Sequence, residues 1–91
     1  MKAEIIKISK CPSKFTGNFY WIFFKDCETG KSYRMPTASM YRNFRLWKSL
    51  VLNPEQAAGV ICEGLVVKGE GIIDADYMTK CRISQKLKKE V

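Results

Sequence analysis

Short apolar runs separated by turn residues predict five β-strands in this chain. The runs are rich in β-branched or aromatic residues, which favour strands. They span residues 2–10, 19–25, 31–35, 59–68 and 77–84, with a further short pairing at 72–73. A Pro/Ser/Gly-rich loop at 11–18 and a hairpin turn at 26–30 connect the first three. Pro36 closes the third run, and Gly64 marks a bulge or a sharp bend in the fourth.

A helical period replaces the strand pattern between the third and fourth runs. Four apolar side chains recur at the spacing of one helix face, which predicts that they point to the core: Met40, Phe44, Trp47 and Val51. Residues 37–39 contain candidate N-caps for this helix. A second helix start is predicted at Asn53, with Pro54 in the first position, and that turn ends at Gly59.

The second strand has aromatic side chains on both of its alternating faces. One face holds Phe19, Trp21, Phe23 and Lys25, and the other holds Tyr20, Ile22 and Phe24. Because Lys25 ends the first set, we expect that set to face outward and the second set to close the core. For each aromatic, packing in the core is the alternative interpretation.

Charge is unevenly distributed along the chain. The net charge is +7 and the isoelectric point is near 9.4. No acidic residue lies between Glu28 and Glu55, and five basic residues fall in that interval: Lys31, Arg34, Arg42, Arg45 and Lys48. Such a distribution attracts polyanions, although a solubilising surface is the alternative explanation.

Length and composition predict a single domain over residues 1–84, followed by a basic C-terminal tail at 85–91 that holds Lys86, Lys88 and Lys89. The N-terminus alternates charged and apolar residues, and no apolar run approaches the ~20 residues that span a bilayer. We therefore expect a cytoplasmic protein without membrane association.

Catalytic and metal-binding chemistry find little support in the residue types. The chain has no histidine, and its four cysteines (Cys11, Cys27, Cys62 and Cys81) contain no C-x-x-C pair, so a structural zinc site lacks its usual ligand spacing. An even number of cysteines could form two disulfides in a secreted protein, but no export signal accompanies them, so we expect reduced thiols. Asp74 and Asp76 could hold Mg²⁺, but a turn or strand-entry role is more common for such a pair. We expect no enzyme activity, no catalytic residue, no metal and no cofactor.

Three strands, a helical connection and two further strands is the order of a five-stranded OB-fold barrel, which is mainly β with a helix between strands 3 and 4. The chain resembles small OB-fold single-stranded DNA-binding proteins of the phage- or plasmid-encoded kind. The resemblance rests on the loop and aromatic strand at residues 12–24, the returning strand K-S-Y-R-M at 31–35 and G-V-I-C-E-G-L-V-V at 59–67. The basic C-terminus departs from the acidic, glycine-rich tail of bacterial single-strand binding proteins.

The resemblance implies binding of single-stranded DNA across the second and third strands and the adjoining loops. The implied nucleic-acid-binding residues are Lys14, Phe15, Phe19, Trp21, Phe23, Lys25, Lys31, Tyr33 and Arg34, with Arg42, Arg45 and Lys48 as a second patch. Little sequence preference is expected, and RNA is an alternative ligand. The oligomeric state is open, with a homodimer as one expectation. A small β-barrel adaptor that binds a protein through the exposed aromatics is the alternative function.

Overall fold

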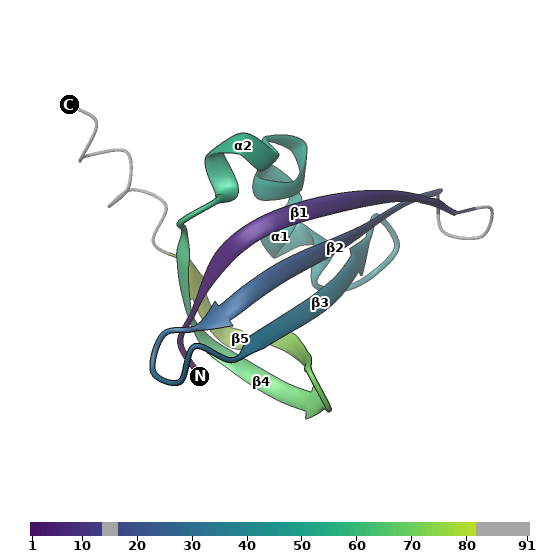
Figure 1. Cartoon of the computed structure of the whole chain (residues 1–91). Coiled ribbons are helices and arrows are strands. Elements are labelled where there is room, and N and C mark those ends of the chain that lie inside the picture. Colours follow the sequence, from purple (N-terminus) through teal and green to yellow (C-terminus); the bar gives the residue numbers. More distant parts are fainter. Residues whose placement is uncertain (14–16, 82–91) are drawn as a thin grey trace.

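A computed structural model describes residues 1–13 and 17–81, and the side chains of residues 1–11 and 19–75. Within these residues, five strands form a closed barrel in the order β1-β2-β3-β5-β4 (Figure 1). The strands are β1 (Ala3–Ser13), β2 (Gly17–Asp26), β3 (Ser32–Ala38), β4 (Ile61–Gly69) and β5 (Ile72–Cys81). Helices α1 (Phe44–Leu52) and α2 (Pro54–Ala57) lie between β3 and β4. The predicted fold class is confirmed: this is a mainly β barrel, compatible with an OB-fold, with a short helix between strands 3 and 4.

Two junctions close the barrel. β1 pairs antiparallel with β4 through Ala3 and Glu4, and β3 pairs parallel with β5 at a single position, Arg34 opposite Ile72. At the second junction the backbone N–H of Arg34 donates to the carbonyl of Gly71 over 2.9 Å. The remaining pairs, β1–β2, β2–β3 and β4–β5, are antiparallel, so β1, β2 and β3 form one continuous curved sheet.

The first hairpin is longer than predicted. Most of the loop expected at residues 11–18 is strand, since Pro12 lies opposite Asn18 and Ser13 opposite Gly17. Beyond Glu4, β1 has no further pairing with β4 among the described residues. A proline is tolerated in such an edge segment, because a missing N–H there removes no ladder bond on that side.

Strand β3 passes through Pro36 instead of ending before it, so the predicted end was wrong. The N–H of Arg34 points toward β5, and Pro36 has the same alternation, so its missing N–H lies on the side away from β2. The carbonyl of Pro36 accepts a hydrogen bond from Asn43 Nδ2 over 3.1 Å on that side. The ladder with β2 is therefore intact.

Strand β5 is continuous from Ile72 to Cys81, where two separate pieces were predicted. Asp74 and Ala75, which have low strand propensity, are held by pairing with Val66 and Leu65 of β4. The last residues of the predicted strand, 82–84, lie outside the described residues, as does the predicted basic tail at 85–91.

The core confirms the expected orientation of β2. Tyr20, Ile22 and Phe24 are buried, whereas Phe19, Trp21 and Phe23 are half-buried on the other face. Trp47 on α1 is fully buried, and its ring meets that of Phe24 edge-on at 5.9 Å between centroids. Leu50 and Val51 complete the buried side of α1, and Phe44 packs against it.

The helix prediction was wrong at its start. Met40 is 67% exposed, because α1 begins only at Phe44 with Asn43 as N-cap. Residues 39–43 form turns instead, with the N–H of Tyr41 donating to the carbonyl of Ala38. The apolar period at Met40 therefore belongs to a surface turn and not to the helix face.

The predicted start of the second helix and the predicted bulge at Gly64 are both confirmed. Asn53 is the N-cap residue of α2 and Pro54 begins that helix, although the Asn53 side chain donates to the Ser49 carbonyl and not to an α2 N–H. Gly64 has a φ of +83° at a register shift between β4 and β5, which confirms the predicted bulge. Glycine adopts such a φ without the strain that a Cβ would add.

The turn between β2 and β3 is built on Asp26. One carboxylate oxygen of Asp26 accepts the backbone N–H of Glu28 at 2.8 Å and that of Thr29 at 3.3 Å. The hydrogen bond from Glu28 is the main reason that the pKa of Asp26 lies below its usual value, and a small desolvation effect opposes it. The turn therefore holds the β2–β3 hairpin in register.

In the described part of the chain, α1 and α2 are both too short to cross a bilayer.

Candidate nucleic-acid interface

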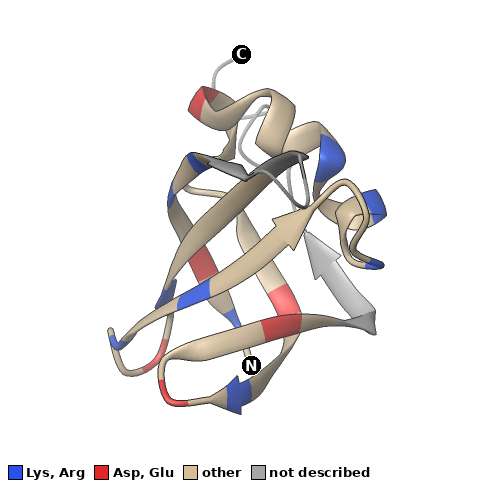
Figure 2. Cartoon of the chain, turned by 90° about the vertical axis from the view of Figure 1, so that its right-hand side faces the viewer, with Lys and Arg blue, Asp and Glu red and all other residues tan. Residues whose placement is uncertain are grey.

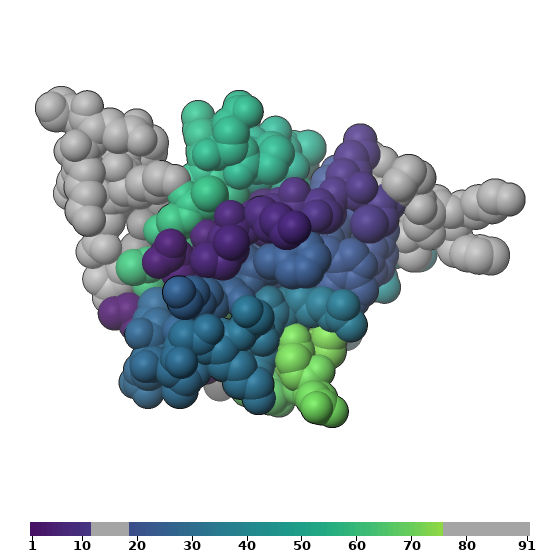
Figure 3. Space-filling view, viewed as in Figure 1, coloured from purple at the N-terminus to yellow at the C-terminus, as the bar shows by residue number. Residues whose placement is uncertain are grey.

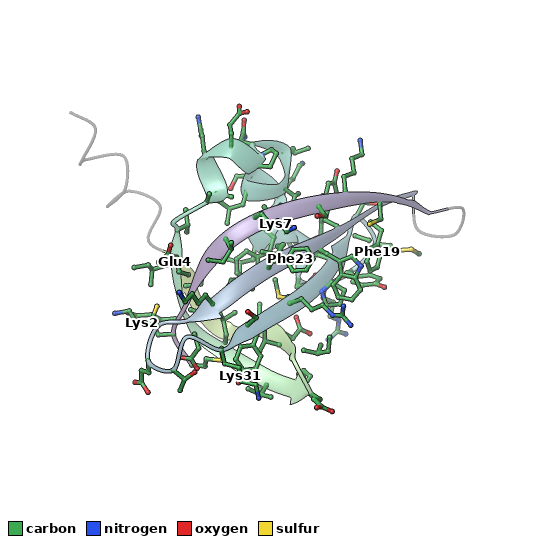
Figure 4. The ribbon with its side chains drawn as sticks, in the orientation of Figure 1. Lys2, Glu4, Lys7, Phe19, Phe23 and Lys31 are labelled. Carbon is green, nitrogen blue, oxygen red and sulfur yellow. The ribbon has the colours of Figure 1, made fainter. Side chains whose placement is uncertain are left out.

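The sheet register places cations on both sides of the outward face of β2. Phe23 lies opposite Lys7 of β1 on one side and opposite Arg34 of β3 on the other. Directly paired residues share a face of the sheet, so this row presents cation, ring and cation to the same surface. Lys7 and Phe23 lie next to each other on the strands, and Phe19 lies further along β2, toward the end of the β1–β2 hairpin (Figure 4).

Two of the rings on this face are covered by a cation. The Lys7 ammonium lies 5.0 Å from the centroid of the Phe23 ring, and the Arg34 guanidinium lies 4.8 Å from that of Trp21. Trp21 also meets the edge of Phe19, with centroids 5.4 Å apart. These cations place a positive charge over the π faces of the two rings.

A fourth aromatic joins the row from the segment that follows β3. The ring of Tyr41 meets Phe19 edge-on at 6.0 Å on the outer face, while Phe44 stacks on Tyr20 at 6.4 Å on the inner side. The segment between them, which follows the end of β3, therefore places one aromatic on each face of β2. We refer to the outer set, Phe19, Trp21, Phe23 and Tyr41, as the platform.

Asn43 fixes the turn that carries Tyr41. The Thr37 hydroxyl donates to Asn43 Oδ1 at 2.7 Å, and Asn43 Nδ2 donates to Asp74 Oδ1 at 2.9 Å as well as to the carbonyl of Pro36. Asp74 Oδ1 also accepts the backbone N–H of Ala75. These bonds tie the β3–α1 connection to β5, which supports a structural role for Asp74.

Three of the predicted binding residues are not part of the platform. Tyr33 lies opposite the buried Phe24 and packs against the core, so it faces away from Arg34 and from the platform. Lys31 lies over the Tyr33 ring at 5.4 Å, near the β2–β3 turn. Lys25 is on the outward face, but its register partner on β1 is Glu4, whose carboxylate offsets a positive charge in that row.

The remaining predicted residues form a second group or lie outside the described residues. Arg42, Arg45 and Lys48 are exposed on the turn before α1 and on α1 itself. Basic positions gather on this segment in the side view (Figure 2). Lys14 and Phe15 lie outside the described residues. The structure therefore brings together Phe19, Trp21, Phe23 and Arg34 from the predicted set.

Sequence reasoning missed Lys7 and Tyr41. Lys7 is opposite Phe23 only because a bulge between Ile5 and Lys7 shifts the register of β1, which no local pattern reveals. Tyr41 had a signal that could have been used: it is an aromatic inside the acid-free interval, directly before Arg42.

The platform lies on an open surface. The surfaces of β1, β2 and β3 form one face, with the helical segment above it and the β4–β5 hairpin below it (Figure 3). Among the described side chains, no three Cys, Asp or Glu residues are grouped as metal ligands would be. Comparison of the chain with protein-family models, curated proteins and solved structures found no match.

Proposed function

We propose that this protein is a non-catalytic binder of single-stranded DNA with little sequence preference. The observation that carries the proposal is the platform itself: a row of aromatic side chains on the outer face of β2, covered and flanked by Lys7 and Arg34. Single strands are bound by this combination, in which bases stack on rings while cations contact phosphates.

The magnitudes favour base stacking over the contacts already present. A cation over an exposed ring contributes about 0.5–1 kcal/mol, whereas a base stacked on an aromatic contributes about 1–3 kcal/mol. An arriving base can therefore displace the Arg34 guanidinium from Trp21, or stack beyond it, and the released guanidinium can bind a phosphate. Lys7 can act in the same way at Phe23. The strand holds the rings in place, so little side-chain entropy remains to be lost.

Low sequence preference follows from the same chemistry. Every base has a π face, so stacking discriminates weakly among bases. The platform contributes rings and cations, and the phosphates that the cations contact are the same in every sequence.

A protein-binding adaptor is the competing function. The exposed apolar side chains outside the platform are spread over β1, the turn before α1, α1 and β4, and the largest exposures are at Met40, Leu52 and Val67. Scattered exposure of this kind is ordinary for a soluble domain and identifies no partner surface. The adaptor is therefore an outcome of the test below.

The test is a competition at fixed salt, followed by a salt titration. Fluorescence anisotropy of a labelled oligo-dT measures binding, and unlabelled single-stranded DNA, single-stranded RNA and duplex DNA compete for the protein. We expect single strands to compete well and duplex poorly, because paired bases cannot stack on the platform. The logarithm of the association constant should fall linearly with the logarithm of the salt concentration, with a slope of about −0.7 for each phosphate contacted.

Two results would contradict the proposal. Absence of binding at low salt would remove nucleic acid as the ligand and favour the adaptor. Equal competition by duplex and single strand would show that only charge attraction is present, without stacking. If RNA competes better than DNA, the single-strand interface stands, but DNA is not its preferred ligand.

A further inference from the structure

A basic surface lies directly beyond the end of the platform. Arg42, Arg45 and Lys48 are exposed, while Trp47 and Leu50 on α1 are buried. Residues three apart are neighbours on a helix surface, so Arg45 and Lys48 lie side by side. None of the three forms an ion pair with a described carboxylate, since the described salt bridge is between Lys2 and Glu63.

Tyr41 joins this basic surface to the platform. Tyr41 is 38% exposed, and its ring meets Phe19, which in turn meets Trp21. The aromatic row therefore leaves the sheet and continues onto the segment that carries Arg42, the next residue in the chain. The side view shows this segment beside the end of β3, with the basic positions following it along α1 (Figure 2).

We propose that a single strand longer than the platform continues past Tyr41 and binds Arg42, Arg45 and Lys48 through its phosphates. This inference rests on the proposed function and extends it: the ligand path turns around the end of the barrel, away from the sheet. The recognised chemistry is the phosphodiester backbone, because these three side chains are cations with no aromatic partner among the described rings.

Size and charge agree with this path. Arg45 and Lys48 are three residues apart in α1, which is a rise of about 4.5 Å at about 1.5 Å per residue, and Arg42 lies on the turn that precedes the helix. Cations placed in this order along the chain can contact successive phosphates of one strand. Asp74 is the described carboxylate bound to the neighbouring Asn43, and its Oδ1 already accepts two hydrogen bonds. The Asp74 carboxylate reduces the positive electrostatic potential near this surface, but the three cations outnumber it, so the surface stays positive.

The experiment compares two oligonucleotide lengths on one triple variant. Oligo-dT of about 5 nucleotides covers the platform alone, and oligo-dT of about 15 nucleotides also reaches the basic surface. The variant is R42Q/R45Q/K48Q, because glutamine has a helix propensity close to that of arginine and lysine. The matched control is K2Q/K31Q/K68Q, which removes the same charge from exposed positions outside the proposed path.

The wild-type protein should bind the longer oligonucleotide more tightly. The triple variant should lose about tenfold in affinity for the longer oligonucleotide and lower its salt slope by about 2, since three contacts contribute about −0.7 each. Its affinity for the shorter oligonucleotide should change by about twofold or less. The control variant should reduce both affinities by the same small factor, through the long-range field alone.

Failure of this inference differs from failure of the proposed function. If the wild type binds both lengths equally, or if the triple variant loses the same factor on both, the path does not use this surface although the platform binds. If the wild type binds neither length, the proposed function is wrong, and the proposed contact with the basic surface is wrong as well.

Discussion

Replacing Trp21 with alanine is expected to lower the affinity for oligo-dT by about 5- to 150-fold, while the barrel stays folded. The figure corresponds to the loss of one stacked base, about 1–3 kcal/mol, converted at about 1.4 kcal/mol per tenfold. Trp21 is at the centre of the platform, with the edge of Phe19 beside it and the Arg34 guanidinium over its ring. Anisotropy titrations at fixed salt measure the affinity, and circular dichroism measures the folded fraction.

Two matched variants show whether the loss comes from stacking. Trp21→Phe keeps a π face and should recover most of the affinity. Tyr33→Ala removes an aromatic from the adjacent strand, but on the inner side, so it should leave the affinity nearly unchanged. An unchanged affinity for Trp21→Ala would contradict the platform, and a loss for Tyr33→Ala equal to that for Trp21→Ala would place the binding face elsewhere.

Replacing Trp47 with alanine is expected to lower the free energy of unfolding by about 3–5 kcal/mol. Trp47 has an exposed fraction of 0%, and its ring packs against Phe24 of β2. The total free energy of unfolding of a domain of this size is about 5–15 kcal/mol, so the variant should be only marginally stable. Urea denaturation followed by circular dichroism measures the change.

Trp47→Phe should be far milder, at about 2 kcal/mol or less. The indole Nε1 of Trp47 is buried without a hydrogen-bond partner among the described residues. An unsatisfied buried donor opposes folding by about 1–3 kcal/mol, so removing it offsets part of the lost packing. If Trp47→Phe destabilises the protein as much as Trp47→Ala does, the indole N–H has a stabilising role that this account omits.

Features that depend on one strand or one turn could be predicted from the sequence. The alternation of residues 19–25, ended by Lys25, was sufficient to distinguish the buried face of β2 from the outer one. Gly64 indicated a bulge because glycine adopts a positive φ without strain, and this preference belongs to the residue itself. The order of strands and helix was enough to indicate the barrel.

Features that depend on pairing could not be predicted in the same way. The position of Lys7 beside Phe23 follows from a bulge in β1, and the passage of β3 through Pro36 follows from which side of the strand lacks an N–H partner. Tyr33 was included with Arg34 because the resemblance implied binding across the third strand, although adjacent residues on a strand point to opposite faces. The pairing register and the face of the strand decide where these side chains lie, and the amino-acid composition does not.

The most direct test of the platform uses Trp21 as its own reporter. The chain has two tryptophans, and in a Trp47→Phe protein the remaining indole is the half-buried one on the outer face of β2. Oligo-dT should quench its fluorescence in parallel with the anisotropy signal, and added salt should reverse both changes. Binding by anisotropy without any change in Trp21 fluorescence would contradict the account, because the single strand would then lie on a surface other than the platform.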